Sequence, residues 1–160
     1  MLHIFVDADA CPVKAEVYRV AARYQLAVTL VSNTWMRSPA DPHIRLHVVS
    51  DALDAADDWI AEQVAPGDIV VTADLPLADR CIKRRASVIS PAGRRLTGDN
   101  IGGALATRDL LTGLRSAGER TAGPPPLTKQ DRSRFLQALD DVIQAIRRKG
   151  PPEAGPDHAR

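Results

Sequence analysis

Residues 2–12 read LHIFVDADACP, and this stretch sets the pattern for the rest of the chain. Its short, mostly apolar opening predicts a buried β-strand over 2–6, which stops at the acidic residues Asp7 and Asp9. Pro12 suits the first turn of a helix. The residues after it recur at helical spacing: Val13, Val17, Val20, Ala21 and Tyr24. The stretch therefore predicts a strand, an acidic loop and a helix in immediate succession.

The same alternation of strand and helix continues along the chain. Further strands are predicted over 27–31, 44–49, 68–72 and 87–89, and further helices over 52–64, 76–85 and near 99–115. Ser50 or Asp51 is expected to cap the helix over 52–64. Strands that alternate with helices pair in parallel through right-handed crossovers. We therefore expect an α/β fold, a three-layer αβα sandwich around a mainly parallel five-stranded sheet in the order 3-2-1-4-5.

The C-terminal part predicts one more helix and a tail. After the Gly/Pro linker at 123–126, Thr128 and Asp131 have the spacing of a capping pair. The apolar face of that helix, formed by Phe135, Leu139, Val142 and Ile146, must pack either on its own sheet or on a second subunit. The second alternative would make a homodimer through this helix. Residues 1–149 are predicted to form a single domain, and 150–160 a disordered tail because they are rich in Pro and Gly.

The composition is typical of a globular protein, and the cytoplasm is the expected compartment because no export signal is recognised. The chain has 160 residues, 44% of them apolar and 26% charged. Its apolar runs are too short to span a bilayer, and its first residues do not resemble a signal peptide, so no membrane association is expected. Cys11 and Cys81 form no CxxC pair and are expected to pack as small apolar residues. The net charge of +1 indicates no general affinity for nucleic acid, although basic residues dominate 80–120.

Acidic side chains follow the two strands that the predicted order places side by side. Asp7 ends the first strand, Asp9 follows in the same loop, and Asp74 stands just past the fourth strand. Ligands of α/β proteins bind at the carboxyl ends of the strands, where the strand order reverses. These three acids should therefore converge.

The helix over 52–64 is expected to add a fourth carboxylate. Its buried stripe is predicted to run through Leu53, Ile60 and Val64, and Asp57 falls on that stripe. A carboxylate on an apolar face is unfavourable unless it is paired or metal-bound. Asp54, at the edge of the stripe and in the first turn, could serve instead of Asp57 or together with it.

Crowded carboxylates repel one another, and a hard divalent cation relieves that repulsion. All-oxygen ligands favour Mg²⁺ or Mn²⁺. Zinc is disfavoured because the four histidines are scattered, at His3, His43, His47 and His158. Purely structural roles stay open. Asp7 and Asp9 could cap the helix that starts near Pro12, Asp74 could cap the next helix at Pro76, and Asp79 could pair with Lys83.

Basic residues near these acids could bind a substrate phosphate. Lys14, in the first turn of its helix, either contacts a phosphate or neutralises Asp7 and Asp9. Arg108 shares the apolar stripe of the helix near 99–115, so it needs an anionic partner, either one of the acids or a phosphate. Trp35 and Arg37, in the connection 32–43, could stack on a base, although a lone Trp is more often a core residue.

With these residues placed, the sequence resembles the YaiI/YqxD family of uncharacterised bacterial proteins, which is grouped with the PIN-like nuclease superfamily. The matching stretches are VDADACP at 6–12, DAADD at 54–58, VTADLPLA at 71–78 and Asn100-Ile101. The resemblance implies a PIN-like fold with acids around Mg²⁺ or Mn²⁺. Asp7, Asp57 and Asp74 match that pattern best, with Asp9 and Asp79 as supplements.

Three functions are compatible with this pattern. The leading hypothesis is metal-dependent hydrolysis of a phosphodiester, with RNA favoured, in which Asp7, Asp9, Asp57 and Asp74 hold one or two ions. A haloacid-dehalogenase-type phosphatase would use Asp7 as nucleophile and Asp9 as general acid. Against the phosphatase, Gly98-Asp99 follows no apolar strand and no Asp stands four or five positions after Asp99. The third is a non-catalytic RNA-binding or regulatory module.

Overall fold

The computed structural model describes residues 2–107 and 126–149. In chain order its elements are β1 (His3–Asp7), the 3-10 turn η1 (Ala8–Ala10), α1 (Lys14–Tyr24), β2 (Ala27–Ser32), β3 (Ile44–Val48), α2 (Ala55–Gln63), β4 (Ile69–Val71), α3 (Leu75–Lys83), β5 (Ser87–Ile89), β6 (Arg95–Leu96) and α5 (Lys129–Lys149). Residues 101–107 are helical as well. The predicted alternation of strands and helices is therefore confirmed over the described residues.

The strands form one sheet in the order β3-β2-β1-β4-β5-β6. The first five pair in parallel in the predicted order, with Val6 opposite Leu30 of β2 and opposite Val71 of β4. The prediction of five strands was wrong by one, because β6 adds to β5 as an antiparallel edge. Gly93, at a φ of +88°, takes part in the turn that reverses the chain between these two strands. A strand of two residues is too short to leave a periodic pattern in the sequence.

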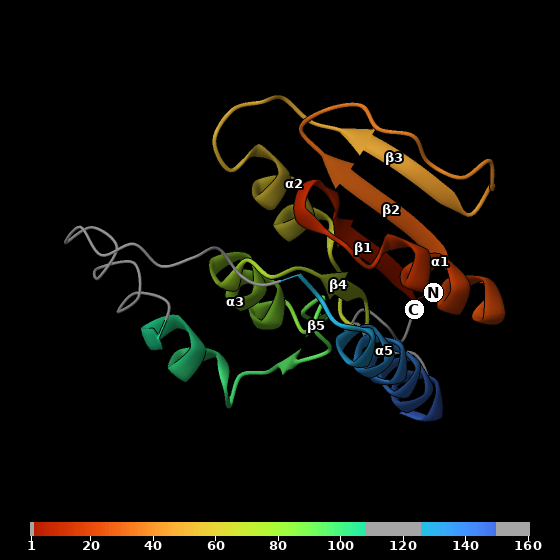
Figure 1. Cartoon of the computed structure of the whole chain (residues 1–160). Helices are drawn as coiled ribbons and strands as arrows, with labels where there is room; N and C mark the ends of the chain where they lie inside the picture. The colour runs from red at the N-terminus through yellow and green to blue at the C-terminus, as the bar shows by residue number, and fades with distance from the viewer. Residues whose placement is uncertain (1, 108–125, 150–160) are drawn as a thin grey trace, which may run out of the picture.

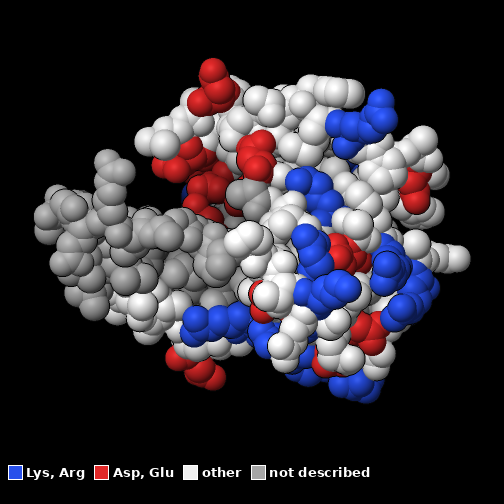
Figure 2. All heavy atoms as spheres, viewed as in Figure 1, with Lys and Arg blue, Asp and Glu red and all other residues white. Residues whose placement is uncertain are grey.

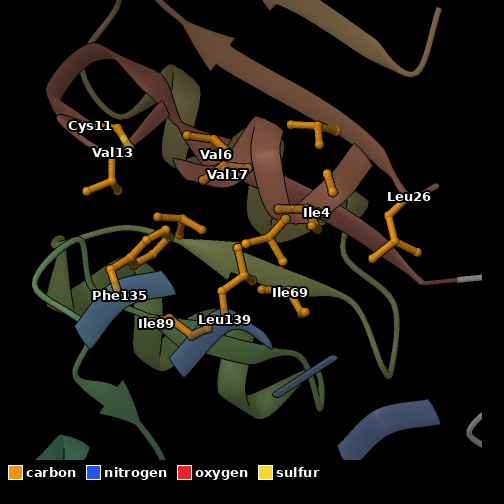
Figure 3. Close-up of a cluster of buried hydrophobic side chains, with 14 of the residues drawn as sticks. Ile4, Val6, Cys11, Val13, Val17, Leu26, Ile69, Ile89, Phe135 and Leu139 are labelled. Atoms are coloured by element: carbon orange, nitrogen blue, oxygen red, sulfur yellow. The ribbon is translucent and has the colours of Figure 1, made fainter. Parts of the chain in front are cut away.

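Helices cover both faces of the sheet, which gives the predicted three layers (Figure 1). On one face, α1 and α5 enclose a core of Ile4, Val6, Ile69 and Phe135, which Figure 3 shows together with its neighbours. On the other face, α2 and α3 cover a second core that contains Phe5, Val31, Val70, Ile60 and Leu77. Alternate residues of β1 point into opposite cores, as the pleat of a strand requires.

The last helix packs on its own sheet, the first of the two alternatives that the sequence left open. Phe135 and Leu139 are fully buried in the same core as β1 and α1. The predicted capping pair is also present, because the Thr128 backbone N–H donates to Asp131 Oδ2 and the Asp131 N–H donates to Thr128 Oγ1, both at 3.0 Å. The apolar face of α5 is therefore covered within the chain.

The start of α2 differs from the prediction. The helix begins at Ala55, and Asp54 precedes it in a left-handed conformation with a φ of 63°. Because this backbone cannot continue a helix, neither Ser50 nor Asp51 caps α2, and Leu53 is 91% exposed where a place on the buried stripe was predicted. Ile60 and Val64 are buried as predicted.

Three predictions fall on residues that the structure does not describe. Arg108 lies outside the described residues, as do the end of the helix predicted near 99–115 and the tail 150–160. Over the part of the chain that is described, no helix is long and apolar enough to cross a membrane.

Candidate functional site

Asp7 and Asp74 come together at the carboxyl edge of the sheet, between β1 and β4. Asp7 is the last residue of β1, and Asp74 caps the start of α3. Between them lies Thr72, whose hydroxyl donates to Asp7 Oδ2 at 2.9 Å and accepts from the Asp74 backbone N–H at 3.0 Å. One buried hydroxyl thus joins two acids that are 67 positions apart in the sequence, and it fixes the orientation of the Asp7 carboxylate.

Asp57 reaches the same place from α2. It lies in the first turn of the helix, and its pKa is raised to about 7. Burial is the main cause, followed by the charges of Asp74, Asp7 and Asp54 and by a side-chain hydrogen bond with Asp74. A hydrogen bond between two carboxyl groups requires a proton on one of them. Near neutral pH the carboxyl group of Asp57 is therefore partly protonated in the metal-free protein.

The surroundings of Asp7 shift its pKa in the same direction. Burial raises its pKa above the ordinary range, the hydrogen bond from Thr72 opposes that rise, and the charges of Asp74 and Asp9 add to it. The charge of Asp74 raises the pKa of both Asp7 and Asp57, and the charge of Asp7 raises that of Asp57, so the three carboxyl groups lie close enough to interact. We call these three residues the acidic cluster.

Asp9 is held by the neighbouring strand. It is exposed in η1, where its Oδ1 accepts a short hydrogen bond from the Ser32 hydroxyl and its Oδ2 accepts from the Asn33 backbone N–H at 2.9 Å. Ser32 is the fully buried last residue of β2. Asp9 thus ties the end of β2 to the rim of the acidic cluster.

The capping alternatives have different outcomes. Asp74 does cap α3, because its Oδ1 accepts from the Leu77 N–H at 2.9 Å. The capping prediction for Asp7 and Asp9 was wrong. The N-cap of α1 is Val13, and no side chain caps that helix. The Asp7 carboxylate is engaged across the sheet by Thr72.

The other predicted site residues lie around the cluster. Asp54, at the N-cap of α2, is exposed, and its charge contributes to the raised pKa of Asp57. Asp79 pairs with Lys83 Nζ at 2.9 Å, the i,i+4 ion pair that the sequence indicated. Lys14 Nζ donates to the Cys11 carbonyl at 2.9 Å, which holds the ammonium group against the loop that carries Asp9.

Two polar residues of the site were not recognised in the sequence. Thr72 and Ser32 bind Asp7 and Asp9, respectively, and both are almost fully buried. A signal for them exists, since each is a hydroxyl residue that ends or directly follows an apolar strand adjacent to β1. A buried hydroxyl at the carboxyl edge of a parallel sheet needs a partner, and in this fold the partner is an acid.

Charge is unevenly distributed over the molecule. Figure 2 shows acidic side chains gathered at the end of the sheet near α2, whereas Lys and Arg side chains gather over α1 and α5. A negative ligand that approached the acidic cluster would be repelled unless a cation came between them.

The donor set fits a hard divalent cation, because the acidic cluster offers only carboxylate oxygens. In the arrangement present here, no group of three or more His, Cys, Asp or Glu side chains among the described residues is placed to hold a metal ion. Metal ligands must be deprotonated, whereas the raised pKa of Asp57 favours its protonated form in the absence of a cation. A cation and the proton on Asp57 therefore compete.

The raised pKa of Asp57 predicts a gain in stability when its charge is removed. In the folded protein the ionised form of Asp57 is disfavoured. The contribution of this residue to the free energy of unfolding is therefore fully favourable below about pH 4 and is lost as the pH rises through about 7. We expect Asp57→Asn to raise the free energy of unfolding of metal-free protein by about 1–2 kcal/mol at pH 8, a value reduced for solvent screening. At pH 4 the gain should vanish.

Urea denaturation at pH 4 and pH 8 in the presence of a chelator measures this difference. Asp58→Asn is the matched control, because Asp58 is exposed on the same helix and pairs with Arg80 at 2.7 Å. It should give no gain at either pH. If Asp57→Asn and Asp58→Asn change the free energy of unfolding equally, or if Asp57→Asn lowers it, Asp57 is solvated in the folded protein.

Comparisons with known proteins identify relatives over almost the whole chain. The family described as "Uncharacterized BCR, YaiI/YqxD family" matches residues 5–145. The UPF0178 protein amb2838 of Paramagnetospirillum magneticum is 54% identical over 151 residues, which covers 94% of this chain and all of the relative. The UPF0178 protein bll3966 of Bradyrhizobium diazoefficiens is 53% identical over 146 residues, 91% of this chain and 87% of the relative. No solved structure matches the chain.

Proposed function

The chain belongs to the YaiI/YqxD family, and we propose that its acidic cluster hydrolyses phosphodiester bonds with the help of Mg²⁺ or Mn²⁺, with RNA as the favoured substrate. The observation that carries the proposal is the convergence of Asp7, Asp57 and Asp74 from β1, α2 and α3. Three separate elements bring carboxyl groups near enough for their charges to interact, at the edge where α/β proteins bind ligands. An arrangement that is electrostatically unfavourable by itself is typical of functional sites.

In this proposal the acidic cluster holds the cation, and Asp9 and Asp54 stand at its rim as supplementary ligands. Thr72 keeps Asp7 in place through the 2.9 Å hydrogen bond. When bound, the ion would supply a hydroxide nucleophile at neutral pH and neutralise charge on the leaving oxygen. Lys14 would contact the substrate phosphate, and Arg108 is a second candidate for that role. Asp79 is the least favoured ligand, because Lys83 already engages it.

RNA is favoured through the resemblance of the sequence to PIN-like nucleases, which is an argument by analogy. The charge distribution supports a substrate with a phosphate backbone only if a cation shields the acids. This requirement makes the proposal specific. RNA binding close to the acidic cluster should depend on the divalent ion and not only on the basic surface of the protein.

Two measurements on metal-stripped protein test the proposal. The first follows thermal unfolding during titration with Mg²⁺ or Mn²⁺, because an ion that binds only the native state stabilises it by about 2.7 kcal/mol at 100 times its dissociation constant. The second follows cleavage of a labelled RNA oligonucleotide on gels, with either ion or with a chelator. We expect stabilisation and cleavage to appear over the same range of metal concentration.

The other outcomes separate the rival functions. Stabilisation and RNA binding without any turnover would favour a non-catalytic module. A phosphoryl group trapped on Asp7 would favour the phosphatase. If neither ion stabilises the protein and no RNA is cleaved, the acidic cluster is not a metal site and the proposal is wrong.

A further inference from the structure

We propose that Trp35 is a stacking platform for an unpaired nucleobase of the strand that the acidic cluster cleaves, so that the substrate is single-stranded. The inference rests on the proposed function for the identity of the polymer. It adds one residue that selects the substrate, and it specifies the class of that substrate. The observations behind it come from outside the acidic cluster.

The first observation is the exposure of the indole ring. The chain has two Phe, two Tyr and two Trp, all within the described residues, and among these Trp35 alone is exposed, at 76%. The other tryptophan, Trp59, is half-buried and stacks on His47 with ring centroids 4.0 Å apart. An indole ring exposed to water adds no hydrophobic stabilisation to the fold. It does offer a flat surface on which a base can stack.

The second observation is that the segment bearing Trp35 is fastened to the site. Asp9 accepts from both the Ser32 hydroxyl and the Asn33 N–H, and the Ser32 hydroxyl oxygen accepts from the Thr34 backbone N–H at 3.1 Å. Trp35 follows Asn33 by two residues, so their Cα atoms are at most about 7 Å apart. The platform therefore lies beside the rim of the acidic cluster.

The same segment is also tied to its other neighbours. Asn33 Nδ2 donates to the Ser50 carbonyl at 2.8 Å, which links the connection after β2 to the connection between β3 and α2. Figure 1 shows both connections leaving the sheet at the end where β1 stops. Met36, directly after Trp35, packs against the core shared with α1 and α5. Polar contacts before Trp35 and an apolar contact after it hold the exposed indole in a restrained segment.

The third observation is the charge around the platform. The acids near Trp35 repel a phosphate backbone, so affinity that does not depend on phosphate contacts is useful at this end of the site. Stacking on an aromatic ring supplies about 1–3 kcal/mol per base and does not depend on sequence. Arg37 is exposed two residues further on and can contact the adjacent phosphate or extend the stack. A base inside a duplex is already stacked on its neighbours, so only an unpaired base has a face free for Trp35.

An exposed aromatic side chain can also serve as a docking point for another protein. The neighbours of Trp35 argue against this role, because Asn33, Thr34 and Arg37 are polar. Leu53 is exposed to 91% and, like Trp35, is an apolar side chain in a connection at the carboxyl edge. It cannot stack as an aromatic ring can, so it serves as a control.

Fluorescence titrations of the Trp59→Phe protein test the inference, because Trp35 is then the single tryptophan. In buffer with Mg²⁺, an unpaired RNA oligonucleotide should quench the emission, and the same strand annealed to its complement should not. By anisotropy with a labelled strand, Trp35→Ala should weaken binding about 5- to 150-fold. Trp35→Phe should recover most of the affinity, and Leu53→Ala should leave it unchanged.

The results separate this inference from the proposed function. Quenching without cleavage would support the stacking platform and count against catalysis, whereas cleavage without quenching would reject the platform and leave catalysis intact. Equal quenching by the single strand and the duplex would contradict selection of an unpaired base. Equal losses for Trp35→Ala and Leu53→Ala would show that general apolar contact, and not stacking, binds the strand.

Discussion

Asp7→Asn should reduce metal-dependent RNA cleavage by about 100-fold or more. A bound metal ion lowers the barrier of such reactions by several kcal/mol, and each 1.36 kcal/mol corresponds to a factor of ten in rate. Asn keeps the size of the side chain but has one neutral oxygen where the carboxylate has two, so it binds a hard cation poorly. The loss should appear as a lower cleavage rate at saturating RNA, and the stabilisation by Mg²⁺ or Mn²⁺ should disappear with it.

The fold should survive this substitution, which makes the result interpretable. The oxygen of Asn can still accept the hydrogen bond that Thr72 donates to Asp7. Burial and the charges of Asp74 and Asp9 raise the pKa of Asp7, so a neutral side chain relieves repulsion in metal-free protein. We therefore expect the midpoint temperature of thermal unfolding without metal to be equal to that of the wild type or slightly higher.

Asp79→Asn is a demanding control for Asp7→Asn. It removes one carboxylate from α3, a helix whose start contributes to the acidic cluster, but Asp79 is engaged by Lys83. It should change cleavage by less than about threefold, the order of a surface ion pair. If Asp7→Asn keeps wild-type activity, or if both substitutions reduce it equally, Asp7 has no special role and the nuclease proposal fails.

Much of the fold could be predicted because each element carries its own local signal. The apolar run 2–6 marks a strand directly, the helical spacing from Val13 to Tyr24 marks the helix after it, and right-handed crossovers then restrict the strand order. The features that were missed depend on contacts between distant residues. β6 is a strand only because Val88 and Ile89 of β5 lie beside it. Leu53 is apolar, but the left-handed backbone at Asp54 keeps it off α2.

The position of the candidate site could be predicted from the sequence, but the hydrogen bonds that hold its side chains in place could not. The parallel strand order brings Asp7 and Asp74 to one edge, and helical spacing places Asp57 on the inner side of α2, as the raised pKa of its carboxyl group supports. The sequence could not indicate that Thr72 bridges two acids or that Ser32 holds Asp9, since these contacts depend on the register of neighbouring strands. Trp35 illustrates the same limit, because no local pattern distinguishes an exposed tryptophan from a buried one.

Phe135→Ala should lower the free energy of unfolding by about 3–5 kcal/mol. Phe135 is fully buried between α1, α5 and the sheet, as Figure 3 shows. The space around it cannot collapse easily. A Cβ added at Gly93, in the turn between β5 and β6, would lie 2.7 Å from the Arg134 carbonyl carbon and 2.8 Å from the Phe135 backbone nitrogen. Because that turn is already packed against the backbone of α5, the helix cannot shift far enough to fill the cavity.

Urea denaturation followed by circular dichroism measures this loss, and Gln137→Ala on the exposed side of α5 is the control, with an expected change within about 0.5 kcal/mol. A loss below about 1.5 kcal/mol for Phe135→Ala would mean that α5 does not complete the core. Because Phe135 does not belong to the acidic cluster, the variant should still cleave RNA at a temperature where it remains folded. Asp7→Asn should have the opposite profile, with stability kept and cleavage lost, so the pair separates the residues that hold the sheet together from those that perform the chemistry at its edge.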